Sequence, residues 1–449
     1  MSTAPLVEFG QRHVTKGLGR MTEDVFAKGE GSWVTLQSGR RILDFTCGIG
    51  VTNLGEPSQH LRGLGLDQTV RLGHCHPKVG IAFHEPYLKL IERLLPIMPD
   101  PSLDSFFFWN SGSEAIEGAL CRTMARTFTG RQNIIAMQGG YHGRTYGAMA
   151  VTKSKTIYSE GTMPLMPGVY TAPFPYWHHF SASPSTDPDE LARQALYQLE
   201  LVLQQQSAPR DTAAILIEPV LGEGGYIPAP HSYLRGVREI CDKHGIILII
   251  DEVQSGFGRT GKHFNIEYSG VRPDIMTIAK GLANGFPLSG IISRKELTDK
   301  LKPGSMGGTY AGNAVSCAAA VAVADAFKEE KILDNVQARS KELFDGLNKL
   351  RQQPELAPYI LDVRGQGLMI AVEFASPSHS AYDPAVKADA PKALASRVSK
   401  RCLEKGMFLM TTSVYETVRF IPALNISKED LAKGYQIFAE AVEEVVREG

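Results

Sequence analysis

Two stretches decide the fold: Ile246-Ile-Leu-Ile-Ile-Asp251 and, further along the chain, Thr277-Ile-Ala-Lys280-Gly281-Leu282. The first is a short apolar run that ends in a carboxylate, which is typical of a strand buried on both faces of a parallel sheet. The second places a lysine just past another apolar run. Lysines normally stay solvated, so these apolar neighbours indicate a chemical role for Lys280. We expect desolvation to lower its pKa from about 10.4 toward that of a usable nucleophile.

Similar apolar runs alternate with helical patterns from about residue 104 to 295. Strands separated by amphipathic helices predict an α/β domain with a largely parallel sheet. Ligands of such sheets collect at the carboxyl ends of the strands. Asn110, Glu218, Asp251 and Lys280 all lie at or just past such ends, so we expect them to converge on one crevice. The predicted strands are Ser105–Trp109, Asn133–Met137, Ala213–Glu218, Ile246–Asp251, Ile275–Ala279 and Ser289–Ser293.

The pattern changes after this region. Ala311–Lys328 predicts a helix rich in small residues, and the amphipathic stretch Ile332–Leu350 looks like a bridge into a second domain of α+β type, which closes with a long helix over Lys428–Arg447. A chain of 449 residues also exceeds the roughly 250 to 300 residues at which a single core stops growing. The predicted division is an N-terminal segment of a small domain at residues 1–75, a large domain at 76–328, and the C-terminal small domain at 329–449.

The segment Glu56–Leu72 stands out as polar and without clear periodicity. It is bracketed by a repeated Leu-Gly pair, Leu54-Gly55 and Leu72-Gly73, at an offset of 72 − 54 = 18 positions. We hypothesise a short in-frame insert at residues 56–72, such as a translated intron. An ordinary solvent-exposed loop is an equally good interpretation.

Composition excludes several classes of partner. Lys plus Arg number 47 against 48 for Asp plus Glu, so no net positive charge marks a nucleic-acid or membrane surface. The six cysteines lack CxxC spacing, which argues against a zinc site or a disulfide framework and favours a reducing compartment. The N-terminus has no apolar core of signal-peptide type. We therefore expect a cytoplasmic protein that acts on small molecules, with a mitochondrial location as the alternative.

Asp251 and Lys280 together form an arrangement suited to holding pyridoxal phosphate. The lysine amine can form a Schiff base with the cofactor aldehyde, and the aspartate can keep the pyridine nitrogen protonated, so that the ring accepts electrons. This pair predicts an enzyme that works on amines.

Other loops after predicted strands allow two interpretations each. Asn110-Ser-Gly-Ser-Glu114 presents backbone N–H groups suited to a phosphate, or is a capping box that only starts a helix. Tyr141 can lie against a planar cofactor ring, or be a core tyrosine. Arg144 is a fixed fork suited to a substrate carboxylate, or a member of a surface ion pair.

Two more loops also allow two interpretations each. Glu218-Pro-Val-Leu-Gly-Glu-Gly-Gly225 ends a strand with two carboxylates. If Glu223 is buried it needs a partner, for which Arg419 is a candidate; the alternative is a turn acid on the surface. Gly307-Gly-Thr-Tyr-Ala-Gly-Asn313 offers Thr309 to a phosphate, or is a plain turn before a helix.

Taken together, these blocks resemble the class III pyridoxal-phosphate aminotransferases of fold type I, from about Val34 to the C-terminus. That fold implies a large domain with a mostly parallel seven-stranded sheet and a smaller α+β domain built from both termini. The matching blocks are Ser111-Gly-Ser-Glu, Tyr141-His-Gly, Glu218-Pro with Gly222-Glu-Gly-Gly, Asp251-Glu-Val-Gln-Ser-Gly-Phe-Gly-Arg-Thr-Gly, Ile278-Ala-Lys-Gly, and Gly308-Thr-Tyr with Gly312-Asn.

The resemblance implies pyridoxal 5'-phosphate as cofactor and a role for each matching residue. Lys280 would bind the cofactor covalently, Asp251 would pair with the pyridine nitrogen, and Gln254 would contact the ring hydroxyl. Thr309 would reach the phosphate of a neighbouring subunit, which makes a homodimer the minimal active unit, with a tetramer as the alternative. Tyr141 would stack on the ring and Gly112 and Ser113 would hold the phosphate, with further cofactor contacts from Ser111, Glu218 and Val253.

Within the family, 4-aminobutyrate aminotransferases look closest, because they match Arg144, Ile49, and Glu223 opposite Arg419. In such enzymes the first arginine grips the distal carboxylate of the donor, and the second leaves its glutamate only when a 2-oxo acid arrives. The resemblance therefore implies transamination of an ω-amino acid, with 2-oxoglutarate as the expected acceptor and Lys280 as general base.

Three alternatives stay open. Relatives with the same blocks resemble amine:pyruvate aminotransferases or dialkylglycine decarboxylases. The segment at residues 56–72, where the chain departs from the family pattern, also allows a catalytically silent cofactor-binding protein.

Overall fold

The computed structural model describes residues 4–15, 19–55, 83–120, 125–377, 387 and 389–449. The segment 56–72, for which an insert is hypothesised, lies outside these residues, and so does the predicted domain boundary at 75/76. Both remain predictions.

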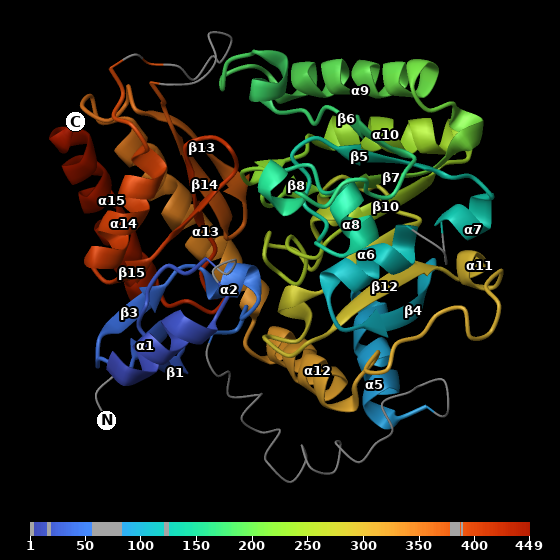
Figure 1. Ribbon diagram of the computed structural model, residues 1–449, viewed down its shortest axis with the longest axis horizontal. Coiled ribbons are helices and arrows are strands. Elements are labelled where there is room, and N and C mark those ends of the chain that lie inside the picture. Colours follow the sequence, from blue (N-terminus) through green and yellow to red (C-terminus); the bar gives the residue numbers. More distant parts are fainter. Residues whose placement is uncertain (1–3, 16–18, 56–82, 121–124, 378–386, 388) are drawn as a thin grey trace.

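A seven-stranded sheet lies at the centre of the larger part of the molecule, in the order β4-β12-β11-β10-β7-β5-β6 (Figure 1). The β12 strand runs antiparallel to both neighbours, whereas the other neighbouring pairs are parallel. This confirms the predicted α/β class with a mostly parallel sheet. The strands are β4 (Leu103–Trp109), β5 (Asn133–Met137), β6 (Val169–Ala172), β7 (Thr212–Ile217), β10 (Ile247–Asp251), β11 (Ile275–Ile278) and β12 (Ser289–Arg294).

Apolar clusters that include helices cover both faces of the sheet, and successive side chains of each strand enter opposite clusters. Leu248 and Ile250 of β10 join the apolar cluster that contains α9 (Pro188–Gln205) and α10 (His231–His244). Ile247 and Ile249 join the cluster on the other face. The helices of that second cluster are α6 (Gly112–Leu120), α7 (Ala125–Thr129), α8 (Tyr146–Val151) and α11 (Lys295–Thr298).

The sequence missed one strand of this sheet. The edge strand β6 has only four residues, Val169-Tyr-Thr-Ala172, and Ala172 is its one fully buried member. Its apolar signal is therefore weak. The predicted helix after Glu114 appears as α6 and α7, with residues 121–124 between them outside the described part of the chain.

The two ends of the chain meet in the smaller part (Figure 1, blue and red). The N-terminal strands β1 (Phe26–Glu30), β2 (Trp33–Leu36) and β3 (Arg41–Asp44) form a sheet with β15 (Met407–Phe408), which pairs parallel with β3. The indole Nε1 of Trp33 donates to Asp430 over 2.9 Å. This agrees with the fold expected from the resemblance, although the domain limits themselves stay a prediction.

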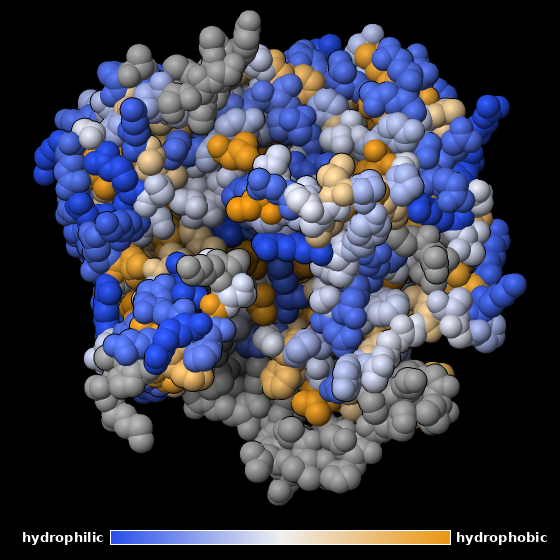
Figure 2. All heavy atoms as spheres, viewed as in Figure 1, coloured by the Kyte–Doolittle hydropathy of each residue, from blue (hydrophilic) through white to orange (hydrophobic). Residues whose placement is uncertain are grey.

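A second, antiparallel sheet completes the smaller part, in the order β13-β14-β17-β16. Its strands are β13 (Ile360–Gln366), β14 (Met369–Phe374), β17 (Thr417–Phe420) and β16 (Met410–Thr412). The helices α12 (Ala314–Glu329) and α13 (Ile332–Arg351) lead into this part, and α14 (Leu394–Glu404) and α15 (Lys428–Glu448) belong to it. Within the described residues, no helix is long and apolar enough to cross a membrane. The face of the molecule in Figure 2 is hollowed near its centre, where the two parts adjoin.

Candidate active site

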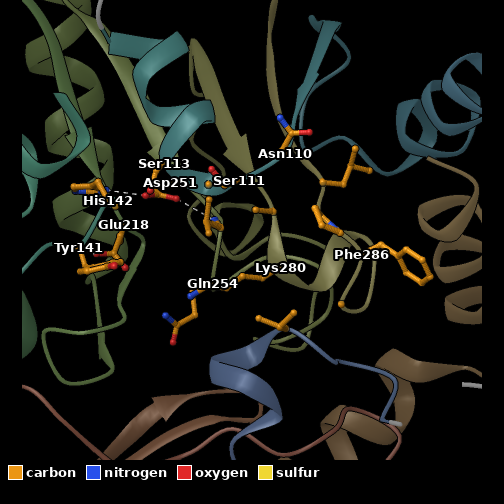
Figure 3. A pocket seen from close by; sticks show the side chains of 18 residues that line it. Asn110, Ser111, Ser113, Tyr141, His142, Glu218, Asp251, Gln254, Lys280 and Phe286 are labelled. Atoms are coloured by element: carbon orange, nitrogen blue, oxygen red, sulfur yellow. Dashed lines mark hydrogen bonds and ion pairs between the residues drawn. The ribbon is translucent and has the colours of Figure 1, made fainter. Parts of the chain in front are cut away.

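A cavity of about 280 Å³ lies at the carboxyl ends of the central strands. Residues from several strand ends line it, as Figure 3 shows. The lining includes most of the predicted cofactor contacts: Ser111, Gly112, Ser113, Tyr141, Glu218, Asp251, Val253, Gln254 and Lys280. Val51, Asn110, His142, Gly143, Ala279 and the segment Gly285-Phe-Pro-Leu288 complete it.

The register of two parallel strands brings Asp251 and Lys280 to one cavity. The last residue of β10, Asp251, is the partner of Thr277 near the end of β11. Lys280 lies three residues after Thr277 and is the first residue of the 3-10 helix η6 (Lys280–Leu282). Its φ of 48° is left-handed, a conformation that is strained in a residue with a side chain. The fold therefore holds the lysine in a position that the local chain would not adopt by itself.

Lys280 has the electrostatic surroundings of a nucleophile. Loss of water around the buried amine lowers its pKa to about 8, and the Glu223 carboxylate opposes this shift only in part. With that pKa about half of the amine is neutral at pH 8, whereas an ordinary lysine with a pKa of about 10.4 is almost fully protonated there. The direction of the shift is the one predicted from its apolar neighbours.

Asp251 is held from three sides. Its Oδ1 atom accepts hydrogen bonds from the Val253 N–H at 3.0 Å and the Thr277 hydroxyl at 3.1 Å. Its Oδ2 atom lies 2.7 Å from Nδ1 of His142 (Figure 3, dashed). The carboxylate is only 4% exposed, so these bonds fix its orientation.

Sequence reasoning missed His142. The residue is part of the Tyr141-His-Gly block, and its position in a loop after a strand was the available signal. Its partner Asp251 is 109 residues away in sequence, which no local pattern reveals. The Nε2 atom of His142 is buried and has no hydrogen-bond partner among the described residues.

The loop before α6 forms the predicted capping box and also lines the cavity. The Glu114 carboxylate accepts the Ser111 N–H at 2.8 Å and the Ser111 hydroxyl at 2.9 Å, and the Ser111 oxygen lies 3.4 Å from the Glu114 nitrogen, as in a capping box. Gly112 and Ser113 then line the cavity at the helix N-terminus, where backbone N–H groups favour an anion. A Cβ atom at Gly112 would lie 3.1 Å from the Val253 side chain, so this glycine permits close packing.

Two polar side chains complete the cavity wall. Glu218 is buried and accepts the N–H groups of Tyr141 at 2.8 Å and Gly222 at 2.9 Å. Burial raises the pKa of its carboxyl to about 7. The Oε1 atom of Gln254 is buried without a hydrogen-bond partner among the described residues, so it is an acceptor in need of a donor.

The predicted substrate residues lie beside this cavity and do not line it. Glu223 and Arg419 form a buried ion pair at 2.5 Å. Although burial acts to raise it, the Arg419 guanidinium holds the pKa of the Glu223 carboxyl below its usual value. The Nε atom of exposed Arg144 donates to the Tyr141 hydroxyl over 3.1 Å.

Ile49 and Thr309, two further predicted site residues, also lie outside the cavity lining. Ile49 is half-buried in the short helix α2 (Cys47–Gly50), next but one to the cavity residue Val51. Thr309 is exposed in the loop before α12 and does not line the cavity of its own chain. Its predicted role toward a neighbouring subunit remains a prediction.

These residues fit pyridoxal phosphate. The unpartnered Gln254 oxygen suits the ring hydroxyl, buried Asp251 suits a protonated pyridine nitrogen, and the N-terminus of α6 suits the phosphate. Lys280 would supply the amine that binds the aldehyde. Fold and donor set together define a pyridoxal-phosphate enzyme of fold type I.

Comparisons with known proteins narrow this class. The model of the family "Aminotransferase class-III" matches residues 18–442. A 5-aminovalerate aminotransferase of Pseudomonas putida is 38% identical over 435 residues, which are 96% of this chain and 96% of the relative. A 4-aminobutyrate aminotransferase of Escherichia coli K12 is 36% identical over 446 residues, 99% of each chain. The chain belongs to the class III aminotransferases, which use pyridoxal phosphate.

Comparison with solved structures also leads to the transaminases. The solved structure of an omega transaminase from Pseudomonas jessenii in complex with PMP superposes with a TM-score of 0.86 at 25% identity, over 98% of each chain. The predicted fold class, enzyme class and cofactor are thereby confirmed.

The lowered pKa of Lys280 predicts a distinct pH dependence of its reactivity. A protonated amine is not nucleophilic, so modification of Lys280 by a small acylating reagent should rise with pH through about 8 and then level off. The reactivity of free Nα-acetyl-lysine, the control, should keep rising to about pH 10.4. The measurement is quantitative mass spectrometry of the Lys280 peptide from cofactor-free protein. A Lys280 profile that coincides with the free amino acid would contradict this description of the site.

Proposed function

We propose that this aminotransferase moves the amino group of an ω-amino acid to a 2-oxo acid, with 2-oxoglutarate as acceptor. The observation that carries the proposal is the pair of arginines beside the cavity. Arg144 is exposed and bonded to the cavity residue Tyr141. Arg419 is buried and neutralised by Glu223. The names of the two relatives, a 5-aminovalerate and a 4-aminobutyrate aminotransferase, support the same class of donor.

The two arginines suit substrates of different shape. An ω-amino acid carries its carboxylate far from the reacting carbon, where the exposed guanidinium of Arg144 would bind it. A 2-oxo acid carries a carboxylate next to the reacting carbon. We infer that this second carboxylate takes the place of Glu223 on Arg419, so that one site accepts both substrates in turn.

When bound, the cofactor supplies an aldehyde carbon and an electron-accepting ring. Asp251, oriented by His142, would keep a proton on the pyridine nitrogen. The Lys280 Nζ atom, neutral in a large fraction of molecules near pH 8, would take the proton from the substrate carbon that bears the amine and would deliver it to the carbon that the cofactor supplies. Tyr141 would cover one side of the ring, and the N-terminus of α6 would orient the phosphate.

A panel of amines tests this proposal. The ω-amino acids of four and five carbons should react with 2-oxoglutarate. Alkylamines of the same length, which lack the carboxylate, should show a KM about 10-fold or more higher, because a charge-assisted hydrogen bond contributes about 1.5 to 3 kcal/mol. Arg144→Gln should raise the KM of the ω-amino acids and leave the KM of the alkylamines unchanged.

The same panel separates the alternatives. Pyruvate preferred over 2-oxoglutarate would favour an amine:pyruvate aminotransferase, and carbon dioxide released in step with 2-oxo acid consumed would favour a decarboxylase. A cofactor-bound protein with no spectral change on adding any amine would favour a silent binding protein. Equal KM values with and without the carboxylate would contradict the proposed role of Arg144.

We further propose a homodimer as the working unit, because Thr309 matches a family residue that reaches a neighbouring subunit and lies exposed, away from the cavity of its own chain. A cytoplasmic location is proposed from composition alone.

A further inference from the structure

Tyr158 lies between the two arginines on which the proposed function depends. It ends the 3-10 helix η2 (Thr156–Tyr158) and is half-buried. The Cζ atom of Arg144 lies over its ring, 4.6 Å from the centroid. The ring also meets Tyr141 edge-on, with centroids 5.0 Å apart at 72°. No local sequence pattern singles out this tyrosine.

The hydroxyl of Tyr158 faces Glu223, the ion-pair partner of Arg419. It lies 3.4 Å from Oε2 of Glu223, whereas Oε1 of the same carboxylate is paired with Arg419 at 2.5 Å. The first of these contacts is longer than the usual 2.5 to 3.0 Å of an O–H···O hydrogen bond. In this arrangement Arg419 holds Glu223, and the phenol stands next to it as a second donor.

A buried carboxylate that loses its cation needs another partner. Glu223 is 8% exposed, and removing one member of a buried ion pair is strongly unfavourable unless other hydrogen bonds replace it. A small shift of the Glu223 carboxylate toward the Tyr158 hydroxyl would shorten their 3.4 Å contact to the length of an ordinary hydrogen bond.

We propose that Tyr158 is a positioning residue for both half-reactions: its ring supports Arg144 for the donor, and its hydroxyl receives Glu223 when Arg419 binds the acceptor. The inference rests on the proposed function and extends it from the two arginines to the group that links them.

The chemistry of the phenol fits this role. Burial, together with the nearby Glu223 carboxylate and Tyr141, raises the pKa of Tyr158 to about 12. The hydroxyl therefore keeps its proton at working pH and remains a donor to the carboxylate. A guanidinium over an aromatic face is attracted by the ring whether or not a hydroxyl is present, so the two functions can be separated by mutation.

Two variants separate them. Tyr158→Phe keeps the ring and removes the hydroxyl, so it should raise the KM of the 2-oxo acid about 10-fold, the lower end expected for a hydrogen bond to a charged group. The KM of the ω-amino acid should stay within about 2-fold of the wild-type value. Tyr158→Leu removes the ring too, and should also raise the KM of the ω-amino acid by about 2- to 5-fold, as expected for an exposed cation–π contact.

Each half-reaction of the purified holoenzyme is followed separately by stopped-flow absorbance, so that the KM and rate constant of donor and acceptor are measured independently. Tyr197→Phe is the matched control, because Tyr197 is 58% exposed on α9, and it should change neither KM. An alkylamine donor without a carboxylate should react at the same rate with all variants.

The outcomes are distinct. Equal KM changes for donor and acceptor in Tyr158→Phe, or none, would overturn the inference while leaving the proposed function intact. Wild-type enzyme that fails to transaminate any ω-amino acid would overturn both. If Tyr158→Leu does not fold, the Phe variant alone decides, since it preserves the packing.

Discussion

Replacing Lys280 by alanine is expected to abolish turnover and the visible absorbance of the bound cofactor. The variant loses both the covalent attachment and the base that moves the substrate proton. A positioned acid–base group alone contributes about 10² to 10⁴-fold to a rate, so we expect a loss of at least about 10⁴-fold. The measurement is transamination in the presence of excess cofactor, together with an absorbance spectrum.

The control for this variant is Lys341→Ala, because the Lys341 side chain is 77% exposed on α13. It should retain wild-type activity and spectrum. An enzyme without Lys280 that kept both the visible band and measurable turnover would falsify the assignment of this lysine.

Replacing Arg419 by methionine should have the largest effect on stability. The substitution leaves the buried Glu223 carboxylate without its cation, and breaking a buried pair in this way costs about 3 to 5 kcal/mol. Urea denaturation should therefore show a clearly lower midpoint. The reaction with 2-oxo acids should also be lost, because no cation remains for the carboxylate beside the reacting carbon.

The double variant Glu223→Gln with Arg419→Met is the matched control. Without the uncompensated charge, it should recover a large part of the lost stability, since neutral replacement of a buried pair is often tolerated. It should still fail to react with 2-oxo acids. A double variant less stable than the Arg419 single variant would contradict the account of this pair.

The sequence predicted the central sheet because the relevant signals are local. Its buried strands are short runs of branched apolar residues, such as Ile247–Asp251, and six of the seven strands in the sheet overlap their predicted ranges. The edge strand Val169–Ala172 has little apolar signal. The observed limits differ from the predicted ones by a few residues, since strand ends depend on neighbours as well as on composition.

The site was predictable where a strand end fixes the position of a side chain. Asp251 and Lys280 meet because β10 and β11 are parallel neighbours with aligned ends. His142 and Tyr158 were missed because their roles come from contacts made across the fold. The contact of Tyr158 with Glu223, for example, joins residues 65 positions apart.

Two other predictions concern a second subunit or residues outside the described part of the chain. The role of Thr309 involves a second subunit. The hypothesis of an insert at 56–72 concerns residues outside the described part of the chain. The two interpretations of the loop before α6, a capping box and a phosphate-binding loop, are compatible. Ser111 and Glu114 cap the helix, while Gly112 and Ser113 line the cavity.

The most direct test of the central claim is to reduce the holoenzyme with borohydride, digest it, and find which peptide carries the pyridoxyl group. The account predicts a single labelled peptide, with the label on the side-chain nitrogen of Lys280. A label on any other lysine, or a protein that stays colourless after reconstitution with pyridoxal phosphate and takes up no label, would contradict it.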